Sequence, residues 1–169
     1  MKYSFEKKIR VGDKCIGEGE PCFIVAEIGL NHNGDVGLAK RLIDGAKECG
    51  ADAVKFQKRS IDKMLTKEIL DMPYDVWYAY GKTYGEHRRA LELSEEEFLD
   101  LKRYADSKSI IFFASAWDED SADFLETLDV PLYKIASADL INLPLIEHIA
   151  KMGKPILLLL VKNHLNYLH

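Results

Sequence analysis

Short apolar runs alternate with amphipathic stretches along most of this chain, and that alternation limits the possible fold more than any other feature. Each run is four to six residues long, as expected of buried strands: Cys22–Glu27, Ala53–Gln57, Ile110–Ser115, Leu132–Ile135 and Ile156–Val161. The intervening stretches predict helices that open near Asp35, Ser94, Asp118 and Asn142. Strict alternation of such strands and helices predicts a parallel sheet with helices packed outside it.

Two folds have this alternation, a doubly wound open sheet and a (β/α)₈ barrel, and the polar residues favour the barrel. Five of them lie at the carboxyl ends of strands: Glu27, Lys55, Gln57, Ser115 and Lys134. In a barrel these ends converge on one site, whereas an open sheet often carries a Gly-rich phosphate loop, and neither GxGxxG nor GxxxxGK[ST] occurs here. A barrel needs about 250 residues and eight strands. With 169 residues, we predict an α/β fold of TIM-barrel type that is incomplete, with about four βα units plus a fifth strand.

The composition shift along the chain predicts three segments. Residues 1–20 are polar and contain glycine, which indicates an N-terminal arm, and we place a partial barrel over residues 21–160 and a divergent tail over 161–169. About 35 residues separate the second strand from Ser94. Connections of this length are usually lids or binding loops, and a solvated charged turn around His87 is the alternative.

Composition excludes several classes of protein. The net charge is −5, from 23 basic and 28 acidic residues, so no clustered basic face for nucleic acid is expected. No apolar segment is long enough to span a membrane, and the first ten residues lack the apolar core of a signal peptide. Three cysteines without CxxC spacing are typical of reduced thiols. We therefore expect a cytoplasmic protein that binds neither nucleic acid nor membrane.

Two lysines within apolar strands are the strongest candidates for chemistry. Lys55 and Gln57 are two residues apart and therefore share one side of their strand. In a barrel, Lys55 and Lys134 would reach solvent only at the catalytic end, where together they could hold a phosphate and a carboxylate. The structural alternative is that Lys55 only neutralises a buried Glu27.

The remaining candidates are weaker when each is taken alone. Glu27 could orient a hydroxyl, act as a general base or pair with Lys55. Ser115 and Ser137 suit an anion as hydroxyl donors, although a single serine is more often a plain loop residue. For His32, a hydrogen bond to the backbone is favoured over ligand binding. No pair of histidines has metal-ligand spacing, so we assign no metal ligand in this chain.

Five phrases taken together resemble the N-acetylneuraminate (sialic acid) synthase family, including its N-acylneuraminate-9-phosphate synthases. They occur in that family's order between residues 22 and 155, and they read FIVAEIGLNHNGD, ADAVKFQ, TYGEHRRALELS, FFASAWDE and YKIASADLINLPLIE. The resemblance covers the N-terminal part of such proteins only. It implies a (β/α)₈ barrel that is followed, in the family, by an antifreeze-like domain.

The resemblance also implies an activity. Members condense phosphoenolpyruvate with N-acetylmannosamine or its 6-phosphate, giving N-acetylneuraminate or its 9-phosphate and free phosphate. A divalent metal, Mn²⁺ or Mg²⁺, is implied as cofactor, and a homodimer as the assembly. The residues leave open which amino sugar is used and whether it is phosphorylated.

By motif, the resemblance assigns roles at the strand ends. Lys55 and Lys134 would hold phosphoenolpyruvate, with Ser115 and Ser137 as hydroxyl donors. The remaining substrate-facing positions are Glu27, Gln57 and Asp139. Asp139 stands where many members have glutamate, so its arm is one methylene shorter.

The chain departs from the family after residue 155, where it reads ILLLLVKNHLNYLH in place of a Ser-Thr-Gly-Met phrase. The later strands, the metal-binding histidines and the antifreeze-like domain have no counterpart, so we expect a truncated and inactive form. Two alternatives stay open. One is a Schiff-base aldolase or lyase with a lysine nucleophile, and the other is a non-catalytic fragment.

Overall fold

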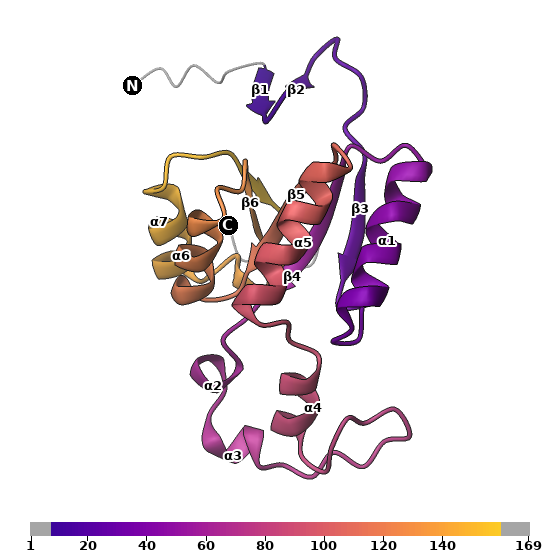
Figure 1. Ribbon diagram of the computed structural model, residues 1–169. Coiled ribbons are helices and arrows are strands. Elements are labelled where there is room, and N and C mark those ends of the chain that lie inside the picture. The colour runs from indigo at the N-terminus through magenta and orange to yellow at the C-terminus, as the bar shows by residue number, and fades with distance from the viewer. Residues whose placement is uncertain (1–7, 160–169) are drawn as a thin grey trace.

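Five parallel strands lie side by side in the order in which they occur in the chain. A computed structural model describes residues 8–159 (Figure 1). The sheet order is β3-β4-β5-β6-β7, and the strands are β3 (Val25–Gly29), β4 (Ala53–Lys58), β5 (Ile111–Ala116), β6 (Tyr133–Ile135) and β7 (Ile156–Leu158). Within residues 8–159 the sheet does not close, and β3 and β7 are its edges. The prediction of an incomplete TIM-barrel-type α/β fold is confirmed.

Four helices cover one face of this sheet (Figure 1). They are α1 (Val36–Glu48), α5 (Glu95–Ser107), α6 (Glu119–Thr127) and α7 (Leu143–Ala150). Each begins where the sequence predicts, because the side chains of Asp35, Ser94, Asp118 and Asn142 accept hydrogen bonds from backbone N–H groups in the first turns. No helix among the described residues is long and apolar enough to cross a lipid bilayer.

The core lies between the sheet and these helices. Phe56 of β4 is fully buried and stacks on Phe112 of β5, with ring centroids 5.0 Å apart, while Phe98 of α5 meets both rings edge-on. Side chains alternate along a strand, so the residues between these point to the opposite face, the interior of a barrel. On β4 those residues include Lys55 and Gln57.

Residues 8–17 form a hairpin across the amino ends of the strands. In it, β1 (Lys8–Val11) pairs antiparallel with β2 (Lys14–Gly17), and Val11 is 1% exposed. The segment expected as an arm therefore contains a hairpin that contributes to the core. The expected tail, residues 161–169, lies outside the described residues, as does the end of the predicted strand Ile156–Val161.

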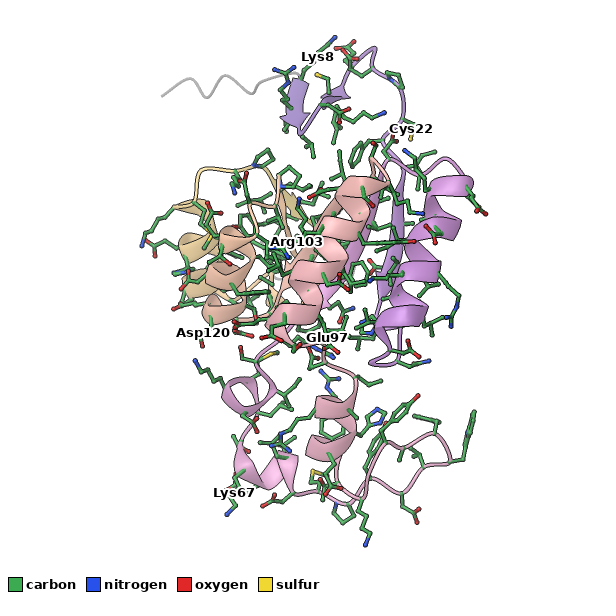
Figure 2. The ribbon with its side chains drawn as sticks, in the orientation of Figure 1. Lys8, Cys22, Lys67, Glu97, Arg103 and Asp120 are labelled. Carbon is green, nitrogen blue, oxygen red and sulfur yellow. The ribbon has the colours of Figure 1, made fainter. Side chains whose placement is uncertain are left out.

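The long connection between β4 and α5, residues 59–94, extends beyond the carboxyl ends of the strands, and we call it the excursion (Figure 1). It contains three short helices, α2 (Ile61–Met64), α3 (Lys67–Leu70) and α4 (Tyr84–Ala90). Figure 2 shows Lys67 at its far end and Lys8 of the hairpin at the opposite end of the molecule. The excursion and the hairpin thus mark the two poles of the sheet.

All three cysteines lie at the hairpin pole. Cys15 is in β2, Cys22 precedes β3, as Figure 2 shows, and Cys49 caps the carboxyl end of α1. All are exposed free thiols.

Candidate functional site

Lys55 is the centre of a polar cluster on the inner face of the sheet. Its Nζ lies 2.8 Å from Glu27 Oε2 and donates a hydrogen bond of 3.0 Å to Ser115 Oγ. The side chain of Lys55 is 8% exposed, whereas that of Glu27 is 57% exposed. The structural alternative, in which Lys55 neutralises a buried Glu27, is therefore wrong in that form, because the buried partner is the lysine.

Strand register aligns two further positions, Gln57 and Lys134, with this cluster. Gln57 pairs with Ser115, and Ser115 pairs with Lys134, so one residue from each of β4, β5 and β6 forms a row across the sheet. Gly29 ends β3 in the left-handed region, with φ of 55°. A Cβ there would lie 3.2 Å from Glu27 Oε1 and 3.5 Å from Gln57 Nε2, so glycine lets both side chains approach the backbone.

Lys134 is part-buried, and its Nζ donates a hydrogen bond of 2.6 Å to the carbonyl oxygen of Ile135. Burial lowers the pKa of Lys134, and the charge of Lys55 lowers it further, while Glu27 and Asp139 act in the opposite direction. The charge of Lys55 is thus close enough to act on Lys134. An anion between them would relieve that repulsion.

Ser137 and Asp139 follow β6 in a single 3₁₀ turn, η1 (Ser137–Asp139). Burial raises the pKa of the Asp139 carboxyl. Its Oδ2 atom is buried without a hydrogen-bond partner in the described part of the chain. The structure therefore brings Glu27, Lys55 and Ser115 into direct contact and aligns Gln57 and Lys134 with them, whereas Ser137 and Asp139 lie just beyond, on the turn after β6.

The histidines separate into two environments. His32 is 1% exposed, and its Nδ1 accepts a hydrogen bond of 3.1 Å from Gly34 N–H, which confirms the favoured interpretation of a turn histidine. His87, on α4, is 8% exposed and packs against Tyr74 and Tyr80, with ring centroids 4.6 and 5.8 Å away. The interpretation of His87 as part of a solvated turn is wrong.

Sequence reasoning missed the residues that fix the excursion to the sheet. Arg59, 2% exposed in its side chain, forms an ion pair with Glu92. Asp118 accepts hydrogen bonds from the backbone N–H of Ser60 at 2.7 Å and from the Ser60 hydroxyl at 2.9 Å, and so ties the exit of β4 to α6. The position of Arg59 directly after β4 was a signal, since an arginine next to a buried strand requires a partner.

Among residues 8–159, no group of three or more His, Cys, Asp or Glu side chains is arranged to hold a metal ion. The described residues therefore do not form a site for the divalent metal that the resemblance implies.

The fold and site together define a TIM-barrel-type α/β protein with a cationic cluster at the carboxyl ends of its strands. Residues 42–160 match the sequence profile of the NeuB family. The chain belongs to the NeuB family.

Individual relatives agree with this assignment. The chain is 47% identical to the human N-acetylneuraminate-9-phosphate synthase over 143 residues, 85% of this chain and 40% of that protein. It is 43% identical to the N,N'-diacetyllegionaminic acid synthase of Legionella pneumophila, over 87% of this chain and 42% of that protein. The solved N-acetylneuraminic acid synthetase of Leptospira borgpetersenii matches with a TM-score of 0.72 and 34% identity, over 89% of this chain and 48% of that one. The chain thus spans less than half the length of these relatives.

Proposed function

We propose that the protein contributes to a synthase reaction in which phosphoenolpyruvate condenses with an N-acylated amino sugar, N-acetylmannosamine or its 6-phosphate. The observation that carries this proposal is the contact of Lys55 with both Glu27 and Ser115, beside Lys134, at the carboxyl ends of four strands. Family membership supports it, because relatives named as synthases of sialic-type acids share this span of sequence.

The two lysines would bind the anionic substrate. Phosphoenolpyruvate carries a phosphate and a carboxylate, and Lys55 and Lys134 offer rotatable N–H donors on neighbouring parts of one face. The Ser115 hydroxyl, which accepts from Lys55, can donate its own proton to a substrate oxygen. Ser137, just beyond Lys134, would supply a second hydroxyl.

Glu27 and Gln57 would face the reacting carbons. In the condensation, C3 of the enol attacks the sugar aldehyde, water adds at C2, and the C2–O bond to phosphate breaks. The exposed Glu27 carboxylate can accept a proton from the attacking water, and the Gln57 amide can orient a sugar hydroxyl. Asp139, whose pKa is raised by burial, would also hold a hydroxyl.

The divalent metal and the homodimer are proposed from the family resemblance and not from contacts of the described residues. Among residues 8–159, no cluster of three or more His, Cys, Asp or Glu side chains is arranged to hold Mn²⁺ or Mg²⁺. We propose a cytoplasmic homodimer on the resemblance alone.

One observation favours a second chemistry. A Schiff-base enzyme needs a lysine that is neutral near pH 7, and burial together with Lys55 lowers the pKa of Lys134. In this alternative, Lys134 would attack a ketoacid carbonyl and release water. Treatment with pyruvate and borohydride tests this alternative. A covalent adduct on Lys134, detected by mass spectrometry, would support the Schiff-base mechanism and contradict the condensation mechanism.

The proposed reaction is tested by incubating the protein with phosphoenolpyruvate and either N-acetylmannosamine or its 6-phosphate, with Mn²⁺ present. Phosphate release is followed by ³¹P NMR, and the nine-carbon acid by mass spectrometry. Phosphoenolpyruvate binding is measured separately by calorimetry. Absence of binding by the wild-type chain would overturn the assignment of the lysines.

A further inference from the structure

Four buried polar atoms lie in the segments where the excursion joins the sheet, and none has a hydrogen-bond partner within residues 8–159. They are His32 Nε2, Arg59 Nη2, Arg88 Nε and Glu92 Oε2. His32 lies in the loop after β3, and Arg59 directly follows β4. Arg88 and Glu92 lie in α4 and just after it. We call these four residues the junction cluster. Buried polar groups normally find partners, so the cluster requires an explanation.

Direct contacts hold these segments against one another. Arg59 Nε donates a hydrogen bond of 2.5 Å to Glu92 Oε1, and Arg59 Nη2 forms an ion pair with the same oxygen. The start of the excursion is thereby joined to its end. A Cβ on Gly34 would lie 2.3 Å from the carbonyl oxygen of Ala90, so the loop that carries His32 packs directly on the end of α4.

Electrostatic interactions link the same residues. Burial lowers the pKa of His32, the charge of Arg59 lowers it further, and the Gly29 carbonyl opposes both, so the ring is neutral at pH 7. Burial raises the pKa of the Glu92 carboxyl, and the charges of Arg59 and Arg88 oppose that rise. Arg59 is thus within electrostatic reach of the other three members of the cluster.

The junction cluster has more free donors than free acceptors. His32 Nδ1 accepts a hydrogen bond of 3.1 Å from Gly34 N–H, which places the proton of the neutral ring on Nε2. Arg59 Nη2 and Arg88 Nε are donors only. Among the described residues, three buried N–H donors are therefore left with one free acceptor, Glu92 Oε2. His32 is 1% exposed and Arg59 is 4% exposed, so bulk water does not reach most of either side chain.

The charge of the cluster is positive. Two arginines and one glutamate leave one positive charge, because the histidine is neutral. Lys58, whose charge acts on Glu92, and Glu97, whose charge acts on His32, are opposite in sign and do not change this sum. A buried charge is costly unless it is paired.

A small anion satisfies this arrangement better than a water molecule does. Water brings two donors of its own, and the cluster has only one free acceptor among the described residues to receive them. An anion brings no donor, and hydrogen bonds from charged N–H groups to an anion are the strong ones. A monovalent anion balances the single positive charge, whereas a dianion such as phosphate would reverse its sign.

We propose that the junction cluster binds a small monovalent anion, chloride under physiological conditions, between His32 Nε2, Arg59 Nη2 and Arg88 Nε. The anion would join the loop after β3 to both ends of the excursion. The His32 ring lies 5.8 Å from the ring of Phe56, which points away from the face that carries Lys55. The anion takes no part in the proposed reaction, so the two proposals can fail independently.

The test is hydrogen exchange of the full chain in sodium chloride and in sodium gluconate, at the same pH and ionic strength. Gluconate is too large for a buried site and therefore controls for screening. We expect exchange in α4 to be about threefold slower or more in about 0.15 M chloride, because a bound ligand reduces opening by the factor 1 + [Cl⁻]/Kd. In addition, the protein should broaden the ³⁵Cl NMR line of the buffer, and bromide should reverse the broadening by competition.

Arg88→Met tests the site directly, because it removes the surplus charge and one donor and leaves the Arg59–Glu92 pair in place. This variant should lose both the difference between chloride and gluconate and the broadening of the chloride line. Arg89→Met is the matched control, since Arg89 is the next residue of α4 and pairs with the exposed Asp62. It should keep both effects. Circular dichroism checks that the variants are folded, and the wild-type measurements decide the question if Arg88→Met is not.

Three results would overturn the proposal. The first is equal exchange of α4 in chloride and gluconate in the wild-type chain. The second is the same chloride dependence in Arg88→Met and Arg89→Met, whether kept or lost, since the effect would then not depend on the junction cluster. The third is stronger protection of α4 by inorganic phosphate than by chloride at equal ionic strength, which would make a dianion the ligand.

Discussion

The sheet core and the excursion are built on different principles, although they are adjacent in sequence. At the end of β4, Phe56 is fully buried between two other aromatic rings. About twenty residues later, Trp77 is 95% exposed. The excursion has three helices of only four, four and seven residues, and polar ties such as the Arg59–Glu92 pair hold it. Apolar burial thus stabilises one region, whereas specific contacts position the other.

The largest effect expected from this contrast is on global stability. Phe56→Ala should lower the free energy of unfolding by about 3–5 kcal/mol, because it removes a fully buried ring from a packed core. Ile69→Ala in the excursion should change it by about 0.5 kcal/mol or less. Urea unfolding followed by circular dichroism measures both. Similar losses in the two variants would show that the excursion belongs to the same cooperative core.

The next effect concerns anion binding. Lys55→Met should weaken phosphoenolpyruvate binding by about tenfold to a hundredfold, which corresponds to the loss of one charged hydrogen bond of about 1.5–3 kcal/mol. Lys82→Met, which removes an exposed charge from the excursion, should leave the affinity within about twofold. Calorimetric titration compares the two variants. Equal losses would mean that the anion is held by the general field of the protein and not by the strand ends.

A smaller effect compares two capping boxes, one in each region. Ser94 caps α5 and Thr83 caps α4, each with a reciprocal bond to a glutamate three residues on. Replacing either by alanine should cost about 1 kcal/mol. Ser94→Ala should lower the global free energy of unfolding, whereas Thr83→Ala should speed hydrogen exchange only in α4. Exchange rates that rise across the sheet in Thr83→Ala would contradict this separation.

The smallest effect is on pH dependence. Burial lowers the pKa of both His32 and His87 in the folded protein. Unfolded imidazole titrates near pH 6.5, so their contribution to stability is complete above that pH and is lost as the pH falls through 6.5 toward the lower folded values. In His32→Gln, the urea unfolding midpoint should fall less as the pH is lowered. In His87→Gln, only the rise in the hydrogen-exchange rate of α4 at low pH should become smaller. A urea unfolding midpoint that rises on acidification would contradict the predicted direction of the pH dependence.

Much of the sheet could be predicted because its determinants are local. Apolar runs bounded by Asp35, Ser94, Asp118 and Asn142 gave the strands and helices in their correct order. The period of two along β4 predicted that Lys55 and Gln57 share a face. The Lys55–Ser115 contact itself was not predicted, although it agrees with the expectation that polar residues at the carboxyl ends of parallel strands converge.

The excursion could not be predicted in the same way. Helices of four residues are too short to show any periodicity, and its one clear signal, the Thr83–Glu86 capping box, lies within the phrase TYGEHRR. The environment of His87 depends on tyrosines that the fold brings together around it. Likewise, the hydrogen bond from Lys134 Nζ to the Ile135 carbonyl oxygen depends on the side-chain rotamer of Lys134, which the spacing of residues in the sequence does not predict.

The location of the three thiols has a practical consequence. Cys15, in β2, Cys22 and Cys49, at the carboxyl end of α1, are exposed free thiols. Figure 2 shows Cys22 at the hairpin pole, at the opposite end of the molecule from Lys67 of the excursion. Maleimide coupling to a sensor chip would therefore attach the protein by that pole and leave the strand ends facing the flowing solution. Fluorophores placed there would report binding without occupying the entrance to the site, so the natural chain is already oriented for surface-based assays.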